Sequence, residues 1–120
     1  MKENTILQKS FRFAVRITNL SRYLQKEKSE YVLSKQILRS GTSIGANVTE
    51  AQRAQSKADF LSKLSIALKE ADETKYWLNV LYQTHYLNSQ EFRSIYKDIR
   101  EISALLTAIC MKLKSTPKSI

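Results

Sequence analysis

The feature that most constrains this chain is the spacing of its apolar side chains, which recur in alternating steps of three and four residues. The longest run comprises Phe92, Ile95, Ile99, Ile102, Leu106, Ile109 and Leu113. This spacing places side chains along one side of an α-helix and is typical of the seam of a helical bundle. It predicts a helix at about 89–114.

Three earlier segments show similar alternation and predict helices at about 6–26, 30–54 and 57–87. Their seams are Ile6, Ser10, Phe13, Ile17, Leu20 and Leu24; Leu33, Ile37, Ile44, Val48 and Ala51; and Phe60, Leu64, Ala67, Ala71, Thr74, Leu78 and Leu81. Only two glycines and one proline are available for the turns that an all-β fold needs. We therefore expect one all-α domain over residues 1–120, an antiparallel up-down-up-down four-helix bundle with a frayed tail at 115–120.

Capping residues predict where the helices begin. Three pairs resemble capping boxes, in which a polar residue and a second residue three positions later bond reciprocally with the backbone. They are Thr5 with Gln8, Ser56 with Asp59, and Asn88 with Glu91. Ser29 is the predicted N-cap of the second helix.

Both glycines lie in the second helical segment, in the stretch RSGTSIGANVTEA at 39–51. Gly41 and Gly45 project near the apolar face that includes Ile44. Each glycine costs a helix roughly 1 kcal/mol relative to alanine, so we expect a neighbouring helix to approach closely there. The alternative is that Gly41 ends one helix and Thr42 or Ser43 caps another. The stretch lacks the Lys-Ser/Thr pair of a phosphate-binding P-loop.

A polar stripe, Arg39, Ser43, Asn47 and Glu50, lies almost opposite that apolar face. A helix of this kind fits two protein neighbours, and we expect one within the chain and one in a second copy. If the second and third helices pair about residues 55–56, Arg39 lies level with Asp72 and Glu73. We predict an ion pair from Arg39 to one of these acids or to an acid of another subunit.

The net charge of +9 favours polyanionic partners. In the first segment Lys9, Arg12, Arg16, Asn19, Tyr23 and Lys26 form one row, and no acid lies between Glu3 and Glu27. Such a row suits the phosphates of a nucleic acid without sequence preference, although a solvated face is an open alternative. The predicted RNA or DNA contacts are Lys9, Arg12, Arg16, Arg22, Lys26, Lys35 and Arg53.

Residues that carry catalysis are sparse. A di-iron bundle needs a Glu-x-x-His motif on each of two helices, and the single histidine, His85, excludes that site. Lys69 and Lys75 flank the acids at 70–73, so ion pairing along the helix explains these acids without catalysis. The lone Cys110 fits a reducing cytoplasm, and no segment is apolar enough to span a membrane. We expect a cytoplasmic protein that is not an enzyme, with no metal, cofactor or membrane partner.

Four aromatic residues crowd the end of the third segment: Tyr76, Trp77, Tyr82 and Tyr86. We expect them to fill a bundle end or an oligomer interface, with stacking on bases as the alternative.

The 39–51 stretch and the AQSKADFLSKLSIALKEADETKYWL run that follows resemble the family of proteins encoded in intervening sequences of bacterial 23S ribosomal RNA genes. The matching residues are Arg39, Ser43, Ile44, Asn47, Glu50, Phe60, Leu64, Ala67, Glu70 and Glu73. The chain departs from the family pattern at two positions. It has Gly45 where members often carry Pro, and Ala51 where they commonly carry Gly.

This resemblance implies an up-down bundle that assembles as a ring-shaped homopentamer with a basic surface. The accessory variability determinants of diversity-generating retroelements look like the same bundle and bind nucleic acid. The expected oligomer or helix-packing residues are Arg39, Gly41, Ser43, Ile44, Gly45, Asn47, Glu50, Glu70, Glu73 and Trp77. Nucleic-acid binding is the leading function. The alternative is a structural or adaptor ring that binds a protein partner, such as one encoded nearby, and a small-ligand binder is a third reading.

Overall fold

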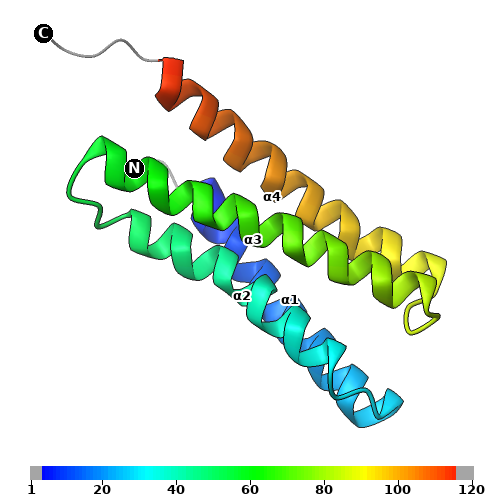
Figure 1. Ribbon diagram of the computed structural model, residues 1–120. Coiled ribbons are helices and arrows are strands. Elements are labelled where there is room, and N and C mark those ends of the chain that lie inside the picture. The colour runs from blue at the N-terminus through cyan, green and yellow to red at the C-terminus, as the bar shows by residue number, and fades with distance from the viewer. Residues whose placement is uncertain (1–3, 116–120) are drawn as a thin grey trace, which may run out of the picture.

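The computed structural model describes residues 4–115, and all regular structure within that range is helical. The helices are α1 (Thr5–Lys28), α2 (Leu33–Ala51), α3 (Lys57–Gln83) and α4 (Ser89–Ser115). Figure 1 shows each helix lying beside the one before it, joined by a short connection. The all-α prediction is confirmed for the described residues, and the tail at 116–120 lies outside them.

The capping box of Asn88 with Glu91 is confirmed. Ser56 is confirmed as the cap of α3, but the carboxylate of Asp59 accepts from the N–H of Gln55 and not from that of Ser56. The hydroxyl of Ser56 accepts from the backbone N–H of Asp59 at 3.0 Å. Asn88 and Glu91 bond reciprocally, each side chain accepting from the other's N–H at 2.8 Å. These contacts fix the first turns of α3 and α4.

The other two caps differ from the prediction. Asn4, not Thr5, caps α1, because its side-chain oxygen accepts from the N–H of Leu7 at 3.2 Å. Ser29 does not begin a helix; it ends α1 with a left-handed backbone, φ 51°. The second non-glycine residue with positive φ is His85 in the α3–α4 connection, φ 68°.

The start of α2 depends on Glu30 instead. Its carboxylate accepts from the N–H of Ser34 at 2.8 Å and from the N–H of Val32 at 3.3 Å. Only 8% of Glu30 is exposed. Burial raises the pKa of this carboxyl, but the N–H groups of Leu33, Ser34 and Val32 outweigh burial, so the pKa lies below its ordinary value. The charged side chain therefore satisfies free amides at the helix start.

The predicted seams form one buried cluster drawn from all four helices. Ile17, Ile44, Leu78 and Ile99 are fully buried. Some seam residues are only partly buried, namely Leu20, Leu33, Phe60, Phe92, Ile109 and Leu113. Most of them lie toward the helix ends, where fewer neighbours cover them, whereas Leu20 lies inside α1.

Both glycines lie inside one continuous helix, so the alternative in which Gly41 ends a helix is wrong. A Cβ at Gly41 would lie 2.7 Å from Cγ2 of Ile17, and a Cβ at Gly45 would lie 3.1 Å from the carbonyl oxygen of Ser10. The expected close approach is thus confirmed, and the approaching helix is α1. α3 of the same chain also packs against α2, and the expected contact of α2 with a second copy stays a prediction.

The helices are offset along the long axis of the molecule. A helix of 27 residues is roughly 40 Å long, whereas the structure extends over 57 Å. Figure 1 shows the α1–α2 connection and the α3–α4 connection separated on the same side of the molecule. The end of the α1–α2 pair therefore projects past the start of α4. None of the described helices is long and apolar enough to cross a membrane.

Candidate nucleic-acid interface

The basic row of α1 faces α4, and α4 supplies the acids that α1 lacks. The ammonium of Lys9 lies 3.3 Å from a carboxylate oxygen of Glu101, and the guanidinium of Arg16 lies 2.7 Å from Asp98. Arg16 also donates to the carbonyl of Ser94 at 3.2 Å and to its hydroxyl at 2.6 Å. Two cations of the predicted row are thus already paired within the chain.

The other five predicted contacts are exposed and form no ion pair within residues 4–115: Arg12, Arg22, Lys26, Lys35 and Arg53. Ser21 donates to the carbonyl of Ser34 at 2.9 Å, so the turns that carry Arg22 and Lys35 lie at one level. Lys26 follows Arg22 by one turn. These three cations define the basic end of the α1–α2 pair; Arg53 follows the opposite end of α2, roughly 27 Å away along the helix.

Exposed aromatic rings accompany this basic end. Tyr23 is 37% exposed and Tyr31 is 54% exposed. The ammonium of Lys28 lies 6.0 Å from the centre of the Tyr23 ring. Sequence reasoning placed Tyr23 in the row but missed Tyr31, whose position beyond the end of α1 has no periodic signal.

A second basic row, on α4, was also missed: Arg93, Lys97 and Arg100 are exposed and unpaired in the part of the chain that the structure describes. Their steps of four and three residues could have revealed them, since the same steps were used to find the row on α1.

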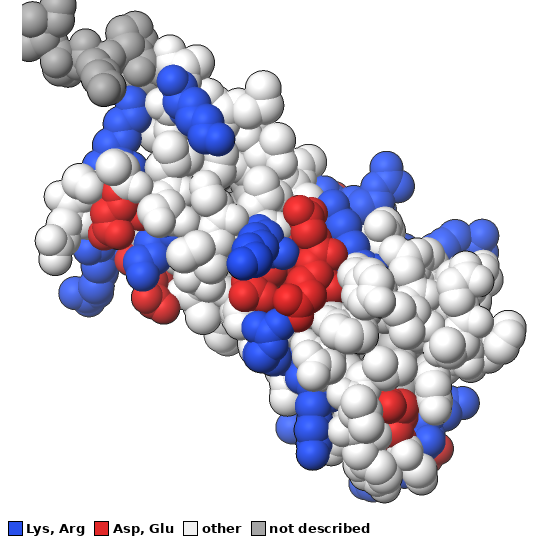
Figure 2. Space-filling model, in the orientation of Figure 1, with Lys and Arg blue, Asp and Glu red and all other residues white. Residues whose placement is uncertain are grey.

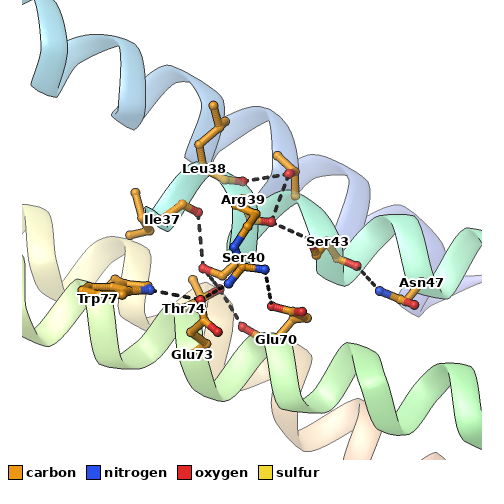
Figure 3. Close-up of polar contacts among 11 residues, drawn as sticks. Ile37, Leu38, Arg39, Ser40, Ser43, Asn47, Glu70, Glu73, Thr74 and Trp77 are labelled. Atoms are coloured by element: carbon orange, nitrogen blue, oxygen red, sulfur yellow. Dashed lines mark hydrogen bonds and ion pairs between the residues drawn. The ribbon is translucent and has the colours of Figure 1, made fainter. Parts of the chain in front are cut away.

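The predicted partner of Arg39 is confirmed as Glu73, while Asp72 pairs with Lys75 at 4.0 Å. Figure 3 shows Arg39 of α2 pointing across to α3, where it also reaches Glu70 at 3.5 Å. The indole N–H of Trp77 donates to Glu73 at 3.2 Å. These contacts fix α2 against α3.

The same contacts shift two pKa values. The hydrogen bond from Trp77 does most to lower the pKa of Glu73; burial opposes it, and the hydrogen bond and charge of Arg39 lower it further. The hydrogen bond to Glu73 raises the pKa of Arg39. Both groups are therefore held in their charged forms.

The rest of the polar stripe lies along the α2–α3 face. Ser43 donates to the carbonyl of Arg39 at 2.6 Å, and Asn47 donates to the carbonyl of Ser43 at 2.9 Å. Glu50 pairs with Lys63 of α3 at 3.2 Å. Figure 2 shows acidic side chains gathered at the middle of this face with basic side chains around them. Ser43 and Asn47 remain partly exposed, bonded to their own helix.

Of the four aromatic residues at the end of α3, three are packed. Tyr82 stacks on Phe92 with ring centres 4.4 Å apart, Tyr86 is partly buried against the core, and Trp77 is tied to Glu73. Only Tyr76 is largely exposed, at 60%. Packing at the bundle end is therefore confirmed for these three.

The single histidine and the single cysteine lie on different elements. His85 is exposed in the α3–α4 connection, whereas Cys110 is buried in α4. Over residues 4–115 no group of three His, Cys, Asp or Glu is arranged to hold a metal ion.

Comparison with known proteins gives a family and a related structure. The family model of the 23S rRNA-intervening sequence protein matches residues 2–108. The chain is also similar to a crystal structure of a protein with unknown function from the S23 ribosomal protein family of Bacteroides thetaiotaomicron VPI-5482. The identity is 56%, the TM-score is 0.87, and the match covers 88% of this chain and 97% of the other. No curated protein matches. With most of its length matched by the family model, this chain belongs to the 23S rRNA-intervening sequence protein family.

Proposed function

We propose that this protein is a non-enzymatic, homo-oligomeric up-down-up-down bundle of the cytoplasm that binds RNA or DNA backbones without sequence preference. The cations that carry this binding are Arg22, Lys26 and Lys35 at the basic end of the α1–α2 pair, with Arg12 and Arg53 adding contacts elsewhere.

The observation that supports this proposal is how the chain uses its carboxylates. Of the ten acids within residues 4–115, six are in ion pairs and three accept from backbone N–H groups at helix starts. Glu27 is the one described acid that does neither. The six are Glu50, Glu70, Asp72, Glu73, Asp98 and Glu101; the three are Glu30, Asp59 and Glu91. Because these acids are engaged elsewhere, the exposed cations on α1 and α2 stay uncompensated. Phosphate oxygens provide the matching charge.

Assembly would strengthen this binding. A ring of identical subunits, for which we propose five, presents the same basic end in several copies, so one nucleic acid meets several weak sites at once. The resemblance of the 39–51 stretch to ring-forming relatives supports this step, and the α2–α3 face is the proposed contact between copies.

The test is a gel-shift titration of labelled RNA and DNA at increasing salt. We expect affinity to fall by about tenfold or more between 50 and 200 mM salt if several phosphates are contacted. The triple variant Arg22→Gln, Lys26→Gln, Lys35→Gln should lose most of the shift. The matched control Lys57→Gln, Lys69→Gln, Lys114→Gln removes the same charge elsewhere and should keep it. Equal losses in both variants would exclude a localised interface.

Charge reversal of Lys9 and Arg16 is unsuitable for this purpose. Glutamate at either position would face Glu101 or Asp98, and the like charges would disturb the contact between α1 and α4.

An adaptor ring that binds a protein is the second candidate. It is favoured by an exposed apolar pair on the outer side of α1, Phe11 at 67% and Val15 at 47% exposure. Absence of any nucleic-acid shift at low salt would make this the leading function, and Phe11→Ser should then weaken partner binding.

A further inference from the structure

A groove lies between the second half of α1 and the start of α4, where the two helix pairs diverge. Its volume is about 460 Å³. Leu20, Leu87 and Ile95 give it an apolar floor, and Asn19, Tyr23 and Gln90 lie at its edge. Leu20 is the α1 seam residue left partly uncovered, and the offset of the helix pairs explains why. The groove is large enough for one flat aromatic group with a polar attachment.

The polar groups at the edge match a nucleobase. The side-chain amides of Asn19 and Gln90 form no hydrogen bond with any residue between 4 and 115, and both are exposed. Each amide offers two donors and an acceptor, which suit the edges of a base. The exposed Tyr23 ring beside them provides a stacking surface.

The charges around the groove favour an anionic occupant. Arg16 lines it and is held in place by Asp98 and Ser94. Glu91, the one acid in the lining, is engaged at the N–H of Asn88. On the same helix Arg22 and Lys26 carry no acidic partner among the described residues.

We propose that this groove holds one unstacked nucleotide of a single-stranded nucleic acid. Its base stacks on Tyr23 and turns its edge toward Asn19 and Gln90, while the neighbouring phosphates lie along Arg22 and Lys26. A duplex cannot place a base there without breaking a pair, so the groove selects single strands. This inference rests on the proposed nucleic-acid function and assigns its substrate class.

The experiment compares fluorescence anisotropy of labelled single strands, RNA and DNA, with a duplex of the same sequence at one low salt concentration. We expect the single strands to bind about fivefold or more tightly than the duplex. Tyr23→Ala should lose about tenfold in single-strand affinity with little effect on the duplex, whereas Tyr23→Phe keeps the stacking surface and the affinity. Tyr76→Ala removes another exposed tyrosine, on α3, and serves as the control.

A second measurement uses the unaltered protein. A strand that carries 2-aminopurine should lose fluorescence on binding as the base stacks on Tyr23. Binding that persists with equal affinity for single strands and duplex, unchanged by Tyr23→Ala and without quenching, would overturn the groove assignment and leave the proposed function intact. Failure of every nucleic acid to bind would overturn both.

Discussion

Gly41 lies where α2 packs against the side chain of Ile17, and that side chain occupies the space that a Cβ at position 41 would need. A Cβ would meet Cγ2 at 2.7 Å and Cγ1 at 2.8 Å of a residue that is fully buried. These atoms are near the root of a β-branched side chain, which has little freedom to turn away. The packing of α1 against α2 thus depends on the absence of a side chain at this position.

We predict that Gly41→Ala destabilises the protein by up to about 2 kcal/mol. Overpacking costs about 1–3 kcal/mol, and the better helix propensity of alanine returns roughly 1 kcal/mol of it. Chemical denaturation followed by circular dichroism measures the difference. The double variant with Ile17→Ala should cost less than the two single changes added together. A rise in stability for Gly41→Ala would contradict the prediction, because it would mean that α1 can move away from α2 to accommodate the Cβ at no cost in free energy.

At the scale of the element, the first turn of α2 is fixed by one buried acid. Glu30 follows the left-handed Ser29 and bonds the free N–H groups that a serine cap would otherwise satisfy. The pKa of Glu30 is lowered in the fold. The unfolded chain therefore takes up a proton first as the pH falls, and the fold loses this contribution below about pH 4.5.

We predict that Glu30→Gln lowers stability at pH 7 and flattens the stability profile between about pH 5 and 3. A neutral amide accepts more weakly from the backbone N–H groups than a carboxylate does. Thermal melts across this range measure the effect, and the control is Glu27→Gln, which changes an exposed glutamate in the last turn of α1. Parallel profiles for Glu30→Gln and the unaltered protein would contradict the prediction.

The helices themselves followed from the sequence, because seams such as Ile95, Ile99 and Ile102 repeat at helical spacing whatever their neighbours are. The cap at Glu30 was not predictable in the same way, since a carboxylate four residues before Ser34 acquires its role only when it is buried. The pairing of Arg16 with Asp98, 82 residues apart in the chain, depends on the register of α1 against α4. The charge pattern of one helix does not show which residues of another helix lie beside it. Lys9 and Arg16 were therefore counted as free cations, although both are paired with acids of α4.

For the whole molecule, the Arg39 network on the α2–α3 face links folding to the proposed assembly. Arg39 pairs with both Glu70 and Glu73, which lie one turn apart on α3. Removal of the guanidinium leaves these two acids facing each other one turn apart, without their counter-charge.

We predict that light scattering after gel filtration gives a mass of five times the 13.9 kDa chain. Arg39→Ala should lower the melting temperature and reduce the assembled fraction. Arg39→Lys should fall between, because lysine cannot reach both acids with a fork. Lys75→Ala, which removes the cation beside Asp72 on the same helix, is the control. A monomeric mass for the unaltered protein would remove the ring from the proposal, and an unchanged Arg39→Ala would remove this face from the assembly.

The chain uses its two glycines inside a helix and turns two of its corners with serine and histidine in left-handed conformations. Corners usually take the residues without a Cβ, and helix interiors usually avoid them. An engineer who adapts this scaffold should therefore leave the middle of α2 untouched and begin at Ser29 and His85, where glycine would relieve backbone strain without entering the core.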